Sequence, residues 1–232
     1  LADPNAATQG YLQSGNFMFG PGDVKFKDLN GDGVINDGSR LLDDHGDLKK
    51  IGNSTPRYEY SFRINTDYKG FDLSVFLQGV GKRDVWGNGF FAIPGFNASD
   101  GAMPEAMATD FWREDRTNAF YPRPYNMANS NNSLNMVQQS RYLLDMSYLR
   151  IKNITFGYTL PTQLVEKANL SSLRVYVSLE NFFTFDNLRD LPIDPEEISG
   201  YSMWNESNYN LGRTGIGTPT FKSASIGLQL NF

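Results

Sequence analysis

A glycine-rich stretch near the start of the chain carries oxygen-bearing side chains at alternate positions. Residues 28–36 read Asp-Leu-Asn-Gly-Asp-Gly-Val-Ile-Asn, which matches the first nine positions of an EF-hand-type calcium loop with Gly33 at the sharp turn. Calcium prefers oxygen ligands, so we expect it as a cofactor that orders a loop rather than as a catalytic ion. The expected metal ligands are Asp28, Asn30, Asp32, the Val34 carbonyl and Asn36.

The closing position of this loop departs from the pattern. An EF-hand loop ends on a bidentate Glu at its twelfth position, and this sequence has Ser39 there. Asp37, Asp43, Asp44 or water would have to complete the metal shell. The alternative interpretation is a turn rich in Asp and Asn that keeps its shape without metal.

The other candidates for chemistry do not form a recognisable catalytic set. The chain has no cysteine and a single histidine, His45, with no Gly-x-Ser-x-Gly motif to accompany it. The adjacent carboxylates Asp43-Asp44, Glu114-Asp115 and Glu196-Glu197 point apart on a strand, so no pair is spaced to work across a sugar. A glycosidase domain is therefore the weakest hypothesis. The sequence predicts no enzyme and singles out no substrate-binding residues.

Three tryptophans fall outside the stretches that alternate like strands. Trp86, Trp112 and Trp204 lie in what we expect to be long loops. Their rings would either stack on sugars or pack the loops together, and the sequence does not choose between the two.

Composition excludes several classes of protein. The 232 residues hold 21 basic and 26 acidic side chains, a net charge of −5, so the chain lacks the basic field that nucleic-acid binding requires. Phe, Trp and Tyr make up 14 % of the chain beside 22 Gly, which is typical of β-rich proteins. No apolar run approaches the length of a membrane-spanning helix. A membrane β-barrel remains open, because its strands show only alternate residues to lipid.

Alternation of apolar and polar residues predicts a β-hairpin that begins at Arg57. Most even positions from Tyr58 to Tyr68 are apolar or aromatic, and the odd positions between them are polar or charged. After Lys69-Gly70 a second alternating run extends from Phe71 to Gln78. So short a connection predicts a tight turn between antiparallel strands.

Three more strands follow. The run 148–158 changes phase near Lys152-Asn153, which predicts a β-bulge. Residues 173–180 alternate after a brief connection with room for one helical turn, and a last strand alternates up to Phe232. We therefore predict an all-β, antiparallel fold.

The connections between the strands alternate between long and short. Transmembrane β-barrels have short periplasmic turns and long extracellular loops, so this pattern predicts part of such a barrel. The expected parts are loops at 1–56, 83–147 and 186–218, hairpins at 57–82 and 148–185, and a final strand at 219–232. Five strands are too few to close a barrel. A soluble β-sandwich also has alternating strands and is the alternative fold.

Five stretches carry a family resemblance. They are PGDVKFKDLNGDGVI at 21–35, IGNSTPRY at 51–58, YKGFDLSVFLQG at 68–79, SYLRIKNITFGYTLP at 147–161 and LRVYVSLENF at 173–182, and a terminal Phe232 accompanies them. Together they resemble the carboxy-terminal part of the SusC/RagA family, which are TonB-dependent outer-membrane transporters of Bacteroidetes. The resemblance spans nearly the whole chain in family order.

The resemblance implies a multi-pass barrel of about 22 antiparallel strands in the cell outer membrane, closed around an amino-terminal plug. Residues 1–232 would supply the carboxy-terminal segment, about the last five strands, without the plug. Family members import glycan or peptide fragments together with a SusD-like surface lipoprotein. They draw energy from TonB-ExbB-ExbD through the amino-terminal part. The alternative function is that of a secreted, calcium-stapled β-sandwich that binds carbohydrate.

The end of the chain carries an expected signal of its own. Ile226, Leu228, Leu230 and Phe232 alternate with polar residues and finish the sequence on an aromatic side chain. In an outer-membrane barrel these residues resemble the signal that the barrel-assembly machinery reads by strand pairing.

Overall fold

Five long strands form one antiparallel sheet in the order β1-β2-β5-β6-β7. The structure, a computed structural model, describes residues 20–87, 103–124, 137–197 and 220–232. The strands of the sheet are β1 (Glu59–Tyr68), β2 (Phe71–Val80), β5 (Tyr148–Thr159), β6 (Ser172–Asp186) and β7 (Ser223–Asn231). The predicted all-β, antiparallel fold is confirmed.

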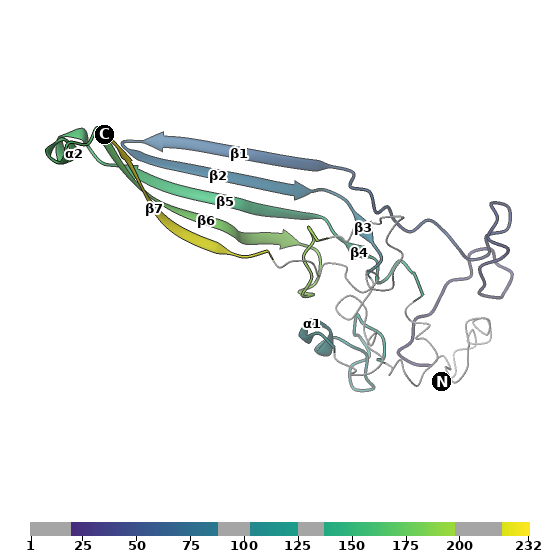
Figure 1. Cartoon of the computed structure of the whole chain (residues 1–232). Coiled ribbons are helices and arrows are strands. Elements are labelled where there is room, and N and C mark those ends of the chain that lie inside the picture. Colours follow the sequence, from purple (N-terminus) through teal and green to yellow (C-terminus); the bar gives the residue numbers. More distant parts are fainter. Residues whose placement is uncertain (1–19, 88–102, 125–136, 198–219) are drawn as a thin grey trace, which may run out of the picture.

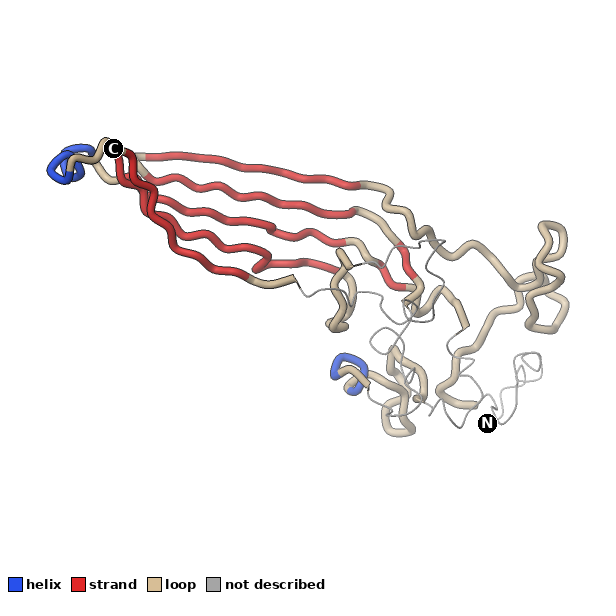
Figure 2. Tube along the Cα trace, in the orientation of Figure 1, coloured by secondary structure: helices blue, strands red, loops and turns tan. Residues whose placement is uncertain are grey.

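The two ends of the sheet differ in their connections (Figure 1). At one end β1 and β2 are joined by Lys69-Gly70, and β5 and β6 by a short segment that contains α2 (Thr162–Val165) and the 3-10 helix η3 (Glu166–Ala168). The carboxy-terminus lies at this end. At the opposite end, which we call the loop end, the long loops gather (Figure 2).

The β1–β2 turn follows from its two central residues. Lys69 has φ 49° and Gly70 has φ 87°, and two positive φ values in a two-residue loop give a hairpin turn whose twist matches that of the strands. Tyr68 then pairs directly with Phe71. The hairpin predicted from this connection is confirmed.

The predicted bulge lies in β5 at Lys152. Between Ile151 and Asn153 the register with β2 slips by one residue, because these two residues pair with the consecutive residues Leu77 and Phe76. A second irregularity follows on the other side, where Ile151 pairs with Phe183 of β6. Because of the extra residue, the apolar side chains before and after Lys152 lie on the same face of the sheet.

The register places most apolar residues of the five strands on one face, which we call the apolar face. One row across the sheet consists of Ile64, Val75, Ile154, Leu179 and Ala224, and the next of Thr66, Leu73, Phe156, Val177 and Ile226. Large side chains here stay uncovered: Phe62 is 58 % and Ile226 79 % exposed. No second sheet packs on this face in the described part of the chain, so the soluble β-sandwich is not supported.

The opposite face, called the polar face, carries small hydrophilic side chains at mid-height. Asn65, Ser74, Thr155, Ser178 and Ser225 form one row across the five strands. Thr155 is hydrogen-bonded to Asn153, and Asn153 donates to the Ser178 hydroxyl at 2.9 Å. Toward the loop end this face becomes strongly charged.

The buried hydrophobic core lies among the loops rather than on the sheet. Its buried members come from segments far apart in the sequence and are Met107, Tyr121, Tyr142, Met146, Leu188, Leu191 and Ile193. Trp86 packs against this cluster. The described parts of the long loops thus pack around one hydrophobic cluster at the loop end.

Several details differ from the predicted elements. The long segment after β2 contains the helix α1 (Glu105–Ala108) and a small ribbon of β3 (Asp84–Val85) with β4 (Leu144–Asp145). β6 extends to Asp186, beyond the alternating run at 173–180 and next to the expected hairpin boundary at residue 185, and β7 ends at Asn231. Among the described residues, no helix has the length and hydropathy to cross a membrane.

Candidate functional site

Arg150 ties a loop to the polar face near the loop end of β5. Its side chain is only 6 % exposed. The guanidinium donates to Asp194 Oδ1 at 2.8 Å, to Glu196 Oε2 at 2.6 Å and to Thr184 Oγ1 at 2.8 Å. Lys152, the bulge residue, reaches Glu196 Oε2 at 3.1 Å. Charge-assisted hydrogen bonds therefore attach the segment that follows β6 to the sheet. We call this set of contacts, made by Arg150 and Lys152 with Asp194 and Glu196, the latch.

Asp194 is the centre of this latch. It accepts hydrogen bonds from the Glu196 backbone N–H at 2.9 Å and from the Thr220 hydroxyl at 2.9 Å, besides Arg150. Burial favours the protonated acid, but the bonds from Arg150, Glu196 and Thr220 outweigh burial and lower the pKa of Asp194. The ionised carboxylate thus holds together β5, the segment after β6 and the approach to β7.

A second ion pair crosses the polar face toward the short-turn end. Arg174 of β6 donates to Asp72 of β2 through Nε at 2.8 Å and Nη2 at 2.5 Å. The pair passes over Gly157 of the intervening strand β5, where a Cβ would lie 2.5 Å from Asp72 Oδ1. Glycine at this position lets the bidentate pair span three strands.

The predicted calcium loop folds into a turn that its own side chains stabilise. Asp28 accepts hydrogen bonds from the N–H groups of Gly31 at 2.6 Å and Gly33 at 2.9 Å. Asp32 accepts from the Val34 N–H at 2.8 Å. This bond and a second one from Asn30 lower the pKa of Asp32. The alternating side chains therefore share one turn, as the motif predicts.

Asp47 closes this loop, a role that the sequence pattern did not reveal. Its two carboxylate oxygens accept from the Leu29 N–H at 2.6 Å and the Asn36 N–H at 2.9 Å. The first of these contacts spans 18 residues. Asp47 thus joins the beginning and the end of the turn.

Two of the residues expected to complete a metal shell, Asp37 and Asp44, have other partners. Ser39 donates its N–H to Asp44, and Asp37 forms an ion pair with Arg40. The Asn36 amide donates to the Val34 carbonyl at 3.3 Å. No group of three or more His, Cys, Asp or Glu side chains suited to a metal occurs in the described ranges. The donor set that fits calcium is therefore confined to the loop itself.

The remaining candidates have local roles. His45 lies 3.1 Å from the Gly46 carbonyl through Nδ1, and Asp115 pairs with the exposed Arg113. Trp112 packs on the backbone of Gly22, where a Cβ would lie 2.4 Å from the ring. Trp86 belongs to the loop core, so both described tryptophans pack loops together. Trp204 lies outside the described residues.

The terminal residues divide into two groups. Ile226, Leu228 and Leu230 lie on the apolar face, paired with Val177, Val175 and Leu173 of β6. Phe232 follows the end of β7 and is 89 % exposed. It has no partner in the register because β6 begins at Ser172, which pairs with Asn231.

The lowered pKa of Asp194 predicts how the latch responds to acid. Its contribution to stability is fully present above the unfolded pKa of about 4 and is lost as the pH falls through the lower folded pKa. In urea unfolding of the complete protein, the wild type should lose stability relative to Asp194→Asn as the pH is lowered through this window. Asp115→Asn, which alters only an exposed ion pair, is the control. Parallel pH curves for wild type and Asp194→Asn would contradict the role of the latch.

Comparison with curated proteins gives two relatives along most of the chain. TonB-dependent receptor P3 of Formosa agariphila is 31 % identical over 238 residues, covering 97 % of this chain and 21 % of that protein. TonB-dependent receptor P26 of the same organism is 24 % identical over 225 residues, covering 91 % of this chain and 20 % of that protein. The chain thus spans about a fifth of the length of these relatives. No family model matches the chain.

Solved structures share the fold. The RagAB peptide importer in its open-open state aligns with a TM-score of 0.51 and 24 % identity over 77 % of this chain and 17 % of that chain. In the closed-closed state it aligns with a TM-score of 0.55 and 22 % identity over 79 % of this chain and 18 % of that chain. The solved structures share the antiparallel fold, and the sequence match over almost the entire chain leads to the conclusion that the chain is a segment of a TonB-dependent receptor.

Proposed function

We propose that the chain forms part of the barrel wall of an outer-membrane importer. In this assignment the apolar face contacts lipid, the polar face lines the barrel interior, and the loop end faces the cell exterior. The observation that supports it most directly is the exposed apolar face, which is continuous over all five strands. The other face carries the ion pairs of Arg150 and Arg174, of which Arg150 is buried. A sheet with one lipid face and one polar face is what a transmembrane barrel requires.

The proposed activity is TonB-dependent import of glycan or peptide fragments rather than enzymatic conversion. The relatives are named as receptors and the fold neighbours as peptide importers. We propose a SusD-like lipoprotein as the surface partner, because the packed loop body offers it a defined surface at the loop end. Coupling to TonB-ExbB-ExbD would run through parts of the transporter outside this chain.

We also propose that calcium binds the loop formed by residues 28–36. Asp28, Asn30 and Asp32 and the Val34 carbonyl provide hard oxygen donors of the kind that calcium selects. When bound, the ion would stiffen the turn. The bonds from Asp47 already hold both ends of the turn, so the ion would reinforce a preformed loop.

Charge substitution on the two faces tests the membrane assignment. Val75 lies in the mid-height row between Ile64 and Ile154 of the apolar face, and Ser74 is next to it on the polar face. Val75→Arg in the full-length transporter should cost about 2 to 4 kcal/mol of folding free energy in lipid vesicles. Ser74→Arg should cost much less, since its side chain reaches water. Equal losses for the two variants would contradict the assignment.

The calcium proposal predicts a metal-dependent change in the loop. Millimolar calcium should slow proteolysis between residues 28 and 47 in the full-length transporter, and a chelator should reverse the effect. Asp28→Asn should weaken this protection, whereas Asp115→Asn, which alters an exposed ion pair in another loop, should keep it. A bound ion would show oxygen ligands at about 2.3 to 2.6 Å. Proteolysis that is identical with and without calcium would end the proposal.

Deletion of Phe232 separates assembly from stability. The residue is exposed and lies beyond β7, so its loss should change the stability of a refolded barrel little. If the barrel-assembly machinery reads the alternating end of the chain, the full-length transporter without Phe232 should insert poorly in cells and be partly degraded. Outer-membrane levels equal to those of the wild type would argue against this signal.

A further inference from the structure

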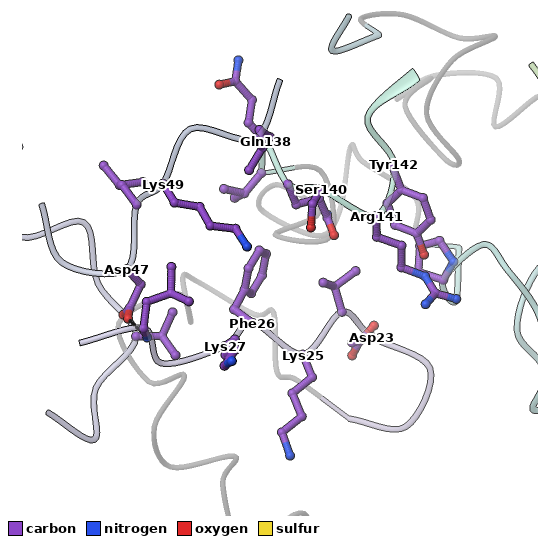
Figure 3. A pocket seen from close by; sticks show the side chains of 18 of the residues that line it. Asp23, Lys25, Phe26, Lys27, Asp47, Lys49, Gln138, Ser140, Arg141 and Tyr142 are labelled. Carbon is purple, nitrogen blue, oxygen red and sulfur yellow. Dashed lines mark hydrogen bonds between the residues drawn. The ribbon is translucent and has the colours of Figure 1, made fainter. Parts of the chain in front are cut away.

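An open pocket of about 1250 Å³ lies among the loops. Its walls come from residues 22–51, 112–122 and 137–142, and Figure 3 shows the side chains that line it. Leu29, Ile35 and Asn36 of the calcium-like loop form part of one wall. The pocket exceeds the usual size of a small-molecule site, so it has room for a ligand of several linked units.

The carboxylates around this pocket are already engaged. Five basic and three acidic residues line it. Asp23 forms an ion pair with Arg123 at 3.3 Å, and Asp37 forms one with Arg40 at 2.5 Å. Asp47 accepts the two backbone N–H groups that close the calcium-like loop. These acids are therefore poor partners for a cationic ligand.

Three of the basic side chains have no carboxylate partner. Lys27 and Lys49 are exposed and form no ion pair with any described residue. Arg141 donates to the carbonyls of Ala119 and Phe120, which fixes its position and leaves its charge uncompensated. The Lys49 side chain extends into the pocket toward Phe26, whereas Lys25 extends away from it (Figure 3). The pocket is thus locally positive on a chain whose net charge is −5.

The uncharged part of the lining is rich in rings and hydrogen-bonding groups. Phe26, Trp112, Phe120, Tyr121 and Tyr142 all contribute to the walls. Gln138, Ser140 and Asn36 add amide and hydroxyl groups between them. Rings beside such groups suit a ligand with apolar ring faces and many hydroxyls. The lining segments are loops, so they offer no strand edge on which a peptide backbone could extend a sheet.

We propose that this pocket binds an oligosaccharide that carries carboxylate or sulfate groups. Lys27, Lys49 and Arg141 form charge-assisted hydrogen bonds with the anionic groups. The half-buried rings of Phe26 and Trp112 contact the sugar rings, because Tyr121 and Tyr142 are buried in the loop core. This assignment rests on the proposed function, because the bound oligosaccharide is cargo only if the chain belongs to an importer. It places a cargo-binding subsite on the outer side of the transporter.

Binding to the purified full-length transporter in detergent tests this subsite. The probes are oligogalacturonate, oligocarrageenan, a neutral maltooligosaccharide of equal length and an oligoglutamate peptide, each titrated by calorimetry. At least one acidic sugar should bind more tightly than the neutral one, and its affinity should fall as salt rises. The double substitution Lys27→Gln with Lys49→Gln should weaken that binding by roughly tenfold or more. Lys50→Gln is the matched control, since Lys50 follows Lys49 in the chain but does not line the pocket.

Three results would overturn the proposal. The acidic sugars could bind no better than the neutral one, or the double variant could bind like the wild type. Oligoglutamate could also bind more tightly than either acidic sugar, which would indicate an acidic peptide instead.

Outer-membrane fractionation of the wild type and of the same variants tests the proposed function separately from the subsite. A transporter that reaches the outer membrane but ignores acidic sugars would refute only the subsite. A wild-type transporter that is absent from the outer membrane would refute the proposed function, whatever it binds in detergent.

Discussion

The two-residue period of β-strands, kept in register across β1, β2, β5, β6 and β7, is the constraint on which the other features of this chain depend. The bulge at Lys152 is essential to it, because a slip of one residue would exchange the two faces of half a strand. With the bulge, Ile151 and Ile154 share the apolar face while Arg150 and Asn153 share the polar one. The separation of a lipid-compatible face from a charged one is therefore a matter of backbone register as well as composition.

The polar face in turn fixes the loops. Arg150 is almost fully buried, and leaving it unpaired would be costly, so the segment that carries Asp194 and Glu196 must lie against the sheet. Leu188, Leu191 and Ile193 of the same segment enter the loop core. One stretch after β6 thus links the wall of the sheet to the packed loop body. The described residues of this stretch are thus attached both to the sheet and to the loop core, although few of them belong to helices or strands.

The sequence predicted the turns and bulges that depend on neighbouring residues alone. Lys69-Gly70 specifies its turn through two neighbouring φ angles, and the phase change at Lys152 reveals its bulge within one strand. The alternating run at 173–180 stops short of the end of β6 because Asn181 interrupts the apolar positions, although Phe183 and Phe185 resume them. The expected hairpin boundary at residue 185 lies next to the observed end at Asp186. Asp47 and the Arg150 latch could not be predicted, since their partners lie up to 46 residues away and no spacing rule connects them. Tertiary contacts between loops leave no periodic trace in a sequence.

The calcium-like loop shows how such non-local contacts shape a binding surface. Its turn depends on Asp28 and Asp32 within the motif and on Asp47 outside it. Because the same loop supplies Leu29, Ile35 and Asn36 to the wall of the pocket, whatever stabilises the turn also preorganises that wall. An ion bound in the turn and a ligand bound in the pocket would then favour the same loop conformation. By linkage each would strengthen the binding of the other, with no contact between them.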